Sequence, residues 1–294
     1  MPRSSLVALV IIFNAMPVHA GDDAVKRTIT YVRKLQTSTG GFTSMAPPPT
    51  APLVPTLRAT STSIRALHYL GSEIPDKQAC IKFVESCWDA KAGAFTDTPA
   101  GKADIFTTAV GIMAVTELGL PTEKYAKPAI RYLSDNAKTF EDIRIAAAGL
   151  ERLKATSPKN TDWLTAVKKI QNADGTFGKS PGQARATGGA SVTLLRLGGK
   201  LDDVAGIIKT LNHGQRQNGG YGKDDDEIAS DLETTYRVMR CYVMLKAKPA
   251  YVEGVRSFIA KCRNEDGGYG IAPGQPSSIS GTYFATIVTH WLKQ

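Results

Sequence analysis

Two carboxylates lie close together where a predicted apolar helix begins, in the segment Ser230-Asp-Leu-Glu-Thr-Thr-Tyr236. Asp231 and Glu233 could contribute to a metal site, or one of them could donate a proton if burial and the neighbouring carboxylate keep it protonated. Asp231 also has a simpler role, because an Asp at a helix start caps the first backbone N–H groups. A cap does not require Glu233. We therefore select Asp231 and Glu233 as candidate catalytic residues, with capping by Asp231 as the alternative.

Acidic residues also lie at the starts of two other predicted apolar helices, at Asp104 and at Glu141-Asp142. If these helix starts share one mouth, their charge would favour a cation or a basic ligand. Asp104, like Asp231, also fits the role of an N-cap.

Motifs of several enzyme classes are absent from the sequence. There is no Gly-x-Ser-x-Gly, His-Glu-x-x-His, Gly-Cys-Gly-Glu-Gln or complete P-loop motif, which argues against hydrolases, zinc metalloproteases, complement-like thioester proteins and NTPases of those types. His68, His213 and His290 have no second His, Cys or carboxylate at ligand spacing on their own predicted helices. We expect these histidines to be structural.

A repeated glycine turn indicates the elements that position the candidate residues. The turn pairs glycine with an aromatic residue, as in Gly40-Gly-Phe42, Gly93-Ala-Phe95, Gly175-Thr-Phe177, Gly219-Gly-Tyr221 and Gly267-Gly-Tyr269. The second and third turns lie almost twice as far apart as the others, as if one degenerate unit had lost its glycines. Such periodic self-similarity is typical of helical repeat proteins.

Each turn separates a polar-faced helix from a more apolar one, which predicts an outer and an inner helix in each unit. The expected outer helices are 22–36, 76–88, 122–136, 161–172, 202–217 and 249–264, and the expected inner helices are 60–70, 104–118, 141–153, 187–197, 231–245 and 281–292. Inner helices that are apolar on nearly all sides favour a closed ring. The predicted fold is therefore all-α, an (α/α)6 toroid of six helical hairpins, with an open superhelix as the alternative.

The turns Gln217-Asn-Gly-Gly-Tyr-Gly222 and Asn264-Glu-Asp-Gly-Gly-Tyr-Gly270 resemble the prenyltransferase/squalene oxidase repeat. Within that superfamily the chain is similar in size and repeat number to β subunits of the protein geranylgeranyltransferase type. The resemblance covers residues 21–294 almost entirely and implies a single α/α-toroid domain of the prenyltransferase and terpene cyclase kind. The fold is shared by different chemistries, so it implies less about activity.

The resemblance implies a zinc ion held by an Asp-x-Cys at the fifth inner helix and a His at the sixth. Here Asp231 is the retained family ligand, Glu233 stands at the Cys position, and Gly281 stands at the His position. For the family's diphosphate site, Thr187-Gly-Gly189 replaces His-Gly-Gly, and Lys223 is the basic residue left after the fifth turn. Thr187 and Lys223 are therefore candidate ligand-binding residues, and zinc is a cofactor only if further ligands complete the Asp231 site.

Terpene cyclases of the same superfamily protonate an alkene with an Asp-x-Asp-Asp-Thr motif, which Asp231-Leu-Glu-Thr-Thr235 partly resembles. The resemblance therefore leaves open two enzyme alternatives. One is a transferase similar to the geranylgeranyltransferase β subunit, and the other is a cyclase-like enzyme that uses Asp231 and Glu233. A transferase would also need a helical α-subunit partner, which the sequence does not indicate.

The first twenty residues read as a secretory signal peptide. Arg3 precedes an apolar run from Leu6 to Phe13, and Val18-His-Ala20 provides a small-residue cleavage site. We therefore expect an exported protein, located in a periplasm, outside the cell or on its surface, with no transmembrane segment. The net charge of +9 is spread without a basic block, so no nucleic-acid partner is expected.

Export would permit disulfides among Cys80, Cys87, Cys241 and Cys262. Cys80 and Cys87 are too far apart along one predicted helix, so Cys241 with Cys262 is the better pair. Four buried free thiols are the alternative.

The leading functional hypothesis is a binding toroid whose central cavity takes an apolar small molecule or a peptide. The cavity would be lined by aromatic and methionine side chains of the inner helices, namely Tyr236, Tyr283, Phe284, Met113 and Met239. Tyr236 and Tyr283 are selected as ligand-binding residues. An interaction scaffold that uses the outer surface remains a further alternative, and the proline-rich segment 44–57 is expected to be either a connector or a lid.

Overall fold

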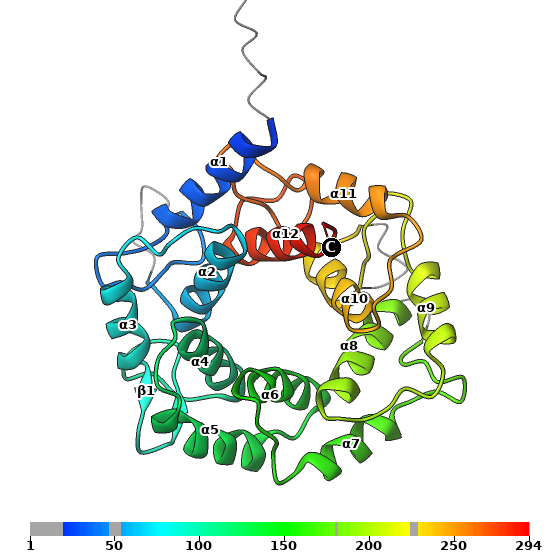
Figure 1. Ribbon diagram of the computed structural model, residues 1–294, viewed down its shortest axis with the longest axis horizontal. Coiled ribbons are helices and arrows are strands. Elements are labelled where there is room, and N and C mark those ends of the chain that lie inside the picture. The colour runs from blue at the N-terminus through cyan, green and yellow to red at the C-terminus, as the bar shows by residue number, and fades with distance from the viewer. Residues whose placement is uncertain (1–19, 47–53, 180–181, 224–228, 294) are drawn as a thin grey trace, which may run out of the picture.

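Twelve helices form two concentric rings in the part of the chain that the computed structural model describes, residues 20–46, 54–179, 182–223 and 229–293 (Figure 1). The outer ring consists of α1 (Ala20–Lys34), α3 (Lys77–Ser86), α5 (Glu123–Asn136), α7 (Asn160–Lys169), α9 (Val204–His213) and α11 (Val252–Lys261). The inner ring consists of α2 (Leu57–Tyr69), α4 (Ile105–Glu117), α6 (Phe140–Leu153), α8 (Gln183–Arg196), α10 (Leu232–Met244) and α12 (Ile279–Trp291). The predicted all-α toroid of six hairpins is confirmed.

The ring is closed. Each inner helix packs against the next, and α12 returns to pack against α2. The two ends of the chain also meet in the outer layer. There the Thr28 hydroxyl of α1 donates a hydrogen bond to the carbonyl oxygen of Gly267, 2.8 Å away. The open superhelix is therefore excluded. No helix among the described residues is long and apolar enough to cross a membrane.

Burial explains the two rings. In α4, every side chain from Thr107 to Val115 is buried, because this helix packs against neighbouring inner helices and the outer layer. In α3, by contrast, the buried side chains are Cys80, Phe83 and Val84, which lie on one face. A two-stranded antiparallel ribbon, β1 (Trp88–Asp89) with β2 (Ala94–Phe95), forms the second turn.

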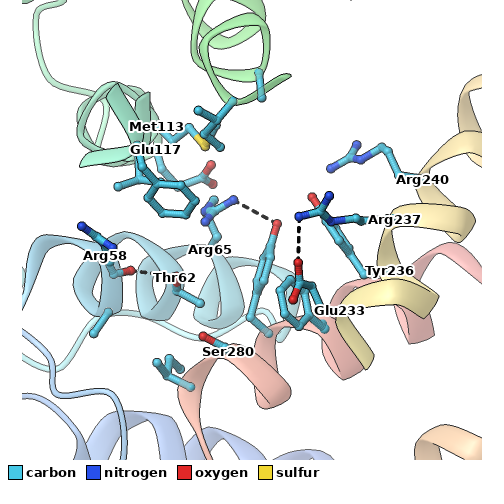
Figure 2. A pocket seen from close by; sticks show the side chains of 18 of the residues that line it. Arg58, Thr62, Arg65, Met113, Glu117, Glu233, Tyr236, Arg237, Arg240 and Ser280 are labelled. Carbon is cyan, nitrogen blue, oxygen red and sulfur yellow. Dashed lines mark hydrogen bonds and ion pairs between the residues drawn. The ribbon is translucent and has the colours of Figure 1, made fainter. Parts of the chain in front are cut away.

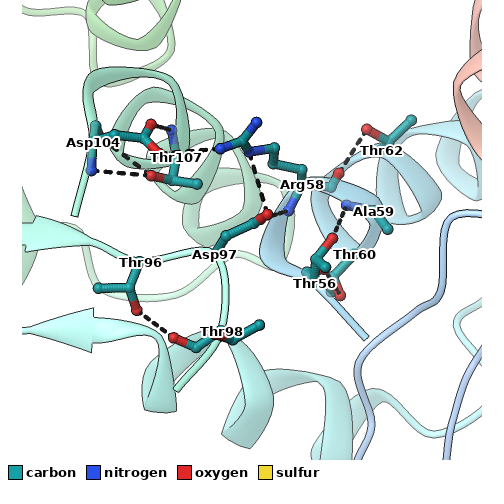
Figure 3. Close-up of polar contacts among 10 residues, drawn as sticks. All are labelled: Thr56, Arg58, Ala59, Thr60, Thr62, Thr96, Asp97, Thr98, Asp104 and Thr107. Carbon is teal, nitrogen blue, oxygen red and sulfur yellow. Dashed lines mark hydrogen bonds and ion pairs between the residues drawn. The ribbon is translucent and has the colours of Figure 1, made fainter. Parts of the chain in front are cut away.

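Side-chain caps fix where the inner helices begin. Asp104 accepts a hydrogen bond from the N–H of Thr107, and the Thr107 hydroxyl reaches back to the Asp104 N–H, which makes a capping box (Figure 3). Asp231 caps α10 through the N–H of Thr234. The capping alternatives for Asp104 and Asp231 are thus confirmed. Arg58 of α2 adds an ion pair to the Asp104 carboxylate at 3.1 Å (Figure 3).

The glycine turns bring outer and inner helices close together. Gly219 has φ +90°, and a Cβ built there would lie 2.0 Å from a backbone oxygen of α11, so only glycine fits. The degenerate third unit lacks such a turn, and only three residues separate α5 from α6. This short connection explains the doubled spacing in the sequence.

The turn aromatics are held by one repeated hydrogen bond. In five of the six hairpins, the backbone N–H of the turn aromatic donates to a threonine hydroxyl of the inner helix that follows. The pairs are Phe42 to Thr60, Phe95 to Thr108, Phe177 to Thr187, Tyr221 to Thr235 and Tyr269 to Thr282. These threonines are buried and lock each turn against its inner helix.

All four cysteines are buried free thiols, so the preferred Cys241–Cys262 disulfide is wrong and the free-thiol alternative holds. Burial raises the pKa of the Cys241 thiol to about 12, which leaves it protonated and unreactive at neutral pH.

Candidate ligand-binding cavity

The inner helices enclose a cavity with a volume of about 610 Å³. Figure 2 shows the side chains of residues that line it. All six inner helices contribute to its wall. The cavity is thus a property of the closed ring, and it lies within the size range of small-molecule sites.

One side of the cavity is an aromatic wall from α10 and α12. The Tyr236 ring lies 5.0 Å from that of Phe284 and 5.9 Å from that of Tyr283, measured between centroids. The Tyr236 ring also stacks on the Trp291 ring, with 5.5 Å between their centroids. Met113 and Ile145 add apolar surface from α4 and α6. The wall can therefore pack against an apolar ligand through dispersion contacts.

Charge distinguishes this cavity from a purely apolar one. Its lining includes seven arginines, Arg58, Arg65, Arg144, Arg152, Arg196, Arg237 and Arg240, and three glutamates, Glu117, Glu151 and Glu233. Among the lining side chains alone, cations thus exceed anions by four. The acidic mouth considered from the sequence, which would favour a cation, is not what the structure shows.

Most of these arginines are held by carboxylates. At the helix starts, Glu233 pairs with Arg237 at 2.8 Å and with Arg185 at 3.2 Å, and Arg237 also pairs with Glu141 at 2.9 Å. Arg144 completes this network through Glu141 at 2.8 Å.

A second set of ion pairs lies at the opposite ends of the inner helices. Glu117 contacts Arg152 and His68, and Glu151 contacts Arg196 at 2.9 Å. Together with the network at the helix starts and the pair between Arg58 and Asp104, these contacts give five of the seven lining arginines a carboxylate partner.

Arg65 and Arg240 have no carboxylate partner within the described part of the chain. Arg65 donates to the Tyr283 hydroxyl at 3.0 Å, and its guanidinium carbon lies 4.5 Å from the Tyr283 ring centroid (Figure 2). Arg240 lies 4.5 Å over the Trp291 ring, and its buried Nε finds no hydrogen-bond partner among the described residues. Two buried or half-buried guanidinium groups thus face the cavity without a carboxylate partner among the described residues.

The arginines change the acidity of Tyr236. Burial by itself raises the pKa of this phenol, but the positive charges of Arg240, Arg196 and Arg65 outweigh burial and lower the pKa to about 7. For its neighbour Tyr283 burial dominates, and the pKa is raised. The pKa values of the two neighbouring phenols are thus shifted in opposite directions.

Glu233 remains ionised, contrary to what an alkene-protonating acid requires. Burial raises its pKa, but the charges of Arg237 and Arg185 and a hydrogen bond from Arg237 outweigh it, so that the pKa is lowered overall. A carboxylate held in this state is a poor proton donor at neutral pH. Lys223, which is exposed and lies outside the cavity lining, contributes to the same lowering.

The other predicted site residues divide between wall and core. Tyr236, Tyr283, Phe284 and Met113 lie on the cavity wall, and their binding of a ligand stays a prediction. Met239 is buried in the core and is absent from the lining.

Thr187 is fully buried, and its hydroxyl exchanges hydrogen bonds with both the N–H and the carbonyl of Phe177. Those bonds engage its hydroxyl in the turn, and Thr187 is not among the residues that line the cavity. Its role in ligand binding stays a prediction. Of the segment 44–57, Ser44 and Thr56 lie on the cavity wall; residues 47–53 lie outside the described residues.

Asp231 does not fit the family's zinc site in this chain. Both of its carboxylate oxygens are engaged by Thr234, through the backbone N–H and the hydroxyl, each at 2.8 Å. Glu233 is paired with arginines, and Gly281 offers no side-chain ligand. Among the described residues, no three His, Cys, Asp or Glu side chains converge as a metal site. The described residues therefore do not fit a zinc ion at this position.

The family model of the prenyltransferase alpha-alpha toroid domain matches residues 4–142 and 132–293. The chain belongs to this family. Its fold is similar to that of a protein geranylgeranyltransferase-I from Candida albicans solved with GGPP, at 13% identity and a TM-score of 0.64, covering 79% of this chain and 83% of the other. A comparison with curated proteins gives no match.

Two further structures show how widely this fold is used. A type II terpene cyclase from Scytonema, solved with geranylgeranyl dihydroxybenzoate, is 10% identical with a TM-score of 0.61, and the match covers 92% of this chain and 96% of the cyclase. A glycosidase is 11% identical with a TM-score of 0.63, and the match covers 92% and 96%. At these identities the likeness shows the toroid alone, and the chemistry must be argued from the side chains.

Sequence reasoning missed Arg65 and Arg240. A signal was present, because each arginine lies within a predicted inner helix, where a buried charge without a partner is costly. Their partners, however, lie on other helices and could not be read from local spacing.

Proposed function

We propose that this protein is an exported binding toroid whose central cavity takes a ligand with an apolar body. The observation that carries the proposal is the aromatic wall of Tyr236, Phe284 and Tyr283, which opens to a cavity of about 610 Å³. Buried aromatic surface of this kind binds apolar groups through area removed from water.

Binding is favoured over the two enzyme alternatives for reasons specific to this chain. The zinc-dependent transferase would need ligands beyond Asp231, which is engaged as a helix cap. The cyclase-like acid would need a protonated carboxyl group, whereas Glu233 is held ionised by arginines. Relatives of the same fold were solved with GGPP and with geranylgeranyl dihydroxybenzoate, which supports a ligand with a long apolar part here.

A neutral fluorescent probe tests the proposal. N-phenyl-1-naphthylamine carries no charge near neutral pH, and its emission rises in an apolar site. We expect saturable one-site binding to the mature protein. Thr62→Trp should abolish it, because Thr62 lies on the cavity wall and the indole would occupy the space of the ligand.

Thr30→Trp is the matched control. Thr30 lies exposed on outer helix α1 and, like Thr62, bonds the carbonyl four residues before it. If Thr62→Trp binds the probe as well as Thr30→Trp does, the cavity is not the binding site and the proposal fails.

Export is tested separately by N-terminal sequencing after expression in a secreting host. We expect the mature chain to begin at Gly21, and retention of residues 1–20 in the secreted or cell-associated product would contradict the proposed signal peptide.

A further inference from the structure

We propose that Arg65 and Arg240 bind the acidic head of the ligand. The ligand class is then an amphipathic organic anion, an apolar body with a carboxylate, sulfonate or phosphate-ester group. This inference rests on the proposed function, since it adds a head group to the ligand of the same cavity.

The first argument is charge balance. Each glutamate of the lining already contacts at least one arginine, and Glu233 contacts two. Arg65 and Arg240 are left without a carboxylate in the described residues, although an uncompensated buried charge is costly. A ligand anion would supply the missing partner at this point of the cavity.

The second argument is the geometry of the two guanidinium groups. Arg65 donates from its Nε to the carbonyl of Ser61 and from its Nη1 to the Tyr283 hydroxyl. Some of the five N–H donors of its guanidinium group are therefore unused within the described chain. Arg240 lies over Trp291 and 5.8 Å from the Tyr236 ring centroid. Stacking fixes both groups in orientation while it leaves N–H donors for an oxyanion.

This location differs from the one that the family resemblance suggested. Thr187 is committed to its turn, and Lys223 lies outside the cavity lining. Arg65 and Arg240 instead lie further along the inner helices, in the second half of α2 and of α10. The anion site is therefore inferred from this chain's own side chains.

The third argument concerns Tyr236, which the same arginines surround. The charged and titratable groups near it come from five inner helices, namely Arg65 and Tyr69 (α2), Arg144 (α6), Arg196 (α8), Glu233, Arg237 and Arg240 (α10), and Tyr283 and His290 (α12). Cations dominate this set and hold the pKa of Tyr236 at about 7. When it forms, the Tyr236 phenolate is a counter-charge for these arginines.

A ligand anion and the phenolate compete for the same positive charge. Below the Tyr236 pKa the phenol is neutral, and the ligand binds without competition. Above that pKa the phenolate must take a proton from solvent as the ligand binds, which costs one proton per ligand and weakens apparent affinity about tenfold per pH unit. Affinity for an anion therefore falls as pH rises, whereas affinity for a neutral ligand does not.

The test compares two dyes with the same aromatic body. N-phenyl-1-naphthylamine is neutral, and 8-anilinonaphthalene-1-sulfonate adds a sulfonate that stays ionised over the whole range. For the wild-type protein between pH 6 and pH 9, we expect the Kd of the sulfonate dye to rise by about 100-fold, while that of the neutral dye stays flat. At pH 6 the sulfonate dye should bind at least tenfold more tightly.

Variants assign the effect to residues. Tyr236→Phe should remove the pH dependence and keep tight sulfonate binding at pH 9. Arg240→Met should weaken the sulfonate dye at pH 6 by about tenfold or more and leave the neutral dye unchanged. Arg131→Met, at a side chain that is 86% exposed on α5, is the control and should change neither dye.

The outcomes separate the two proposals. If the neutral dye binds but the sulfonate gains nothing at pH 6, the anion site is overturned and the binding toroid stands. If the pH dependence survives in Tyr236→Phe, the role of Tyr236 as the competing group is contradicted. If neither dye binds the wild type while Thr30→Trp and wild type melt alike, the binding toroid itself fails, and the anion site fails with it.

Discussion

Replacing Asp231 separates a helix cap from a catalytic or metal-binding carboxylate. The Asp231 carboxylate accepts two hydrogen bonds from Thr234, both at 2.8 Å, at the start of α10. Asp231→Ala removes both, and we expect it to lower the free energy of unfolding by about 1–2 kcal/mol. Asp231→Asn keeps an acceptor for the backbone N–H, so its cost should be only a few tenths of a kcal/mol.

Urea unfolding at neutral pH, followed by far-ultraviolet circular dichroism, measures both variants against wild type. Asp104→Ala provides a second cap of known geometry for scale. The dye affinities of the Asn variant should equal those of wild type, because Asp231 is not part of the cavity wall. The capping account is refuted if Asn costs as much stability as Ala, or if Asn alone abolishes ligand binding or bound metal.

Three further predictions concern the turns, the ion pairs and a repeated threonine. Gly219→Ala should lower the free energy of unfolding by more than about 2 kcal/mol, because the added Cβ would clash with the backbone of α11. Gly119→Ala, also at positive φ but with no atom within 4 Å of the added Cβ, should cost about 1 kcal/mol. Equal costs in thermal melts would contradict the close approach at Gly219. Glu233→Gln should cost about 1 kcal/mol at pH 7 at this partly exposed pair. Because the folded pKa of Glu233 is lowered, its stabilisation exists above the unfolded pKa and is lost as pH falls through the folded value, so the difference in urea unfolding should shrink below about pH 4; a constant difference down to pH 2 would be inconsistent with it. Thr187→Val should lower the free energy of unfolding by about as much as Thr60→Val, roughly 1 kcal/mol, because both hydroxyls accept a hydrogen bond from a turn aromatic. Dye binding should stay unchanged, and a loss of dye affinity would support Thr187 as a binding residue.

The sequence predicted the fold well because the repeat is a local signal. Glycine turns, helix periodicity and capping residues each depend on a few neighbouring positions, and the six units follow from their succession. The degenerate third unit was placed correctly even without its glycines, because α5 and α6 keep their own apolar patterns. Ring closure was inferred from the apolar inner helices and is confirmed by the packing of α12 on α2.

The candidate site was predicted less well because it depends on contacts between distant segments. Arg65 and Tyr283 are 218 positions apart in the chain, and no local pattern indicates that they meet. Glu233 was correctly placed on the cavity, but its arginine partners, which decide its ionisation, come from α8 and from the next turn of α10. Thr187 was selected from the family motif, whereas the structure places it among the threonines that bond the turn aromatics.

The seam of the ring has a consequence for how the cavity comes into existence. Five boundaries between hairpins join segments that are neighbours in the chain, but the sixth joins Thr28 to Gly267, 239 positions apart. That boundary carries the greatest loop-closure entropy and should form last. Until it does, the six units form an open arc, and α2 and α12 cannot bring Arg65 and Tyr283 together. Appearance of the binding site during refolding therefore reports the final docking step, and a chain cut before its last hairpin would keep much of its helix content and have no enclosed interior.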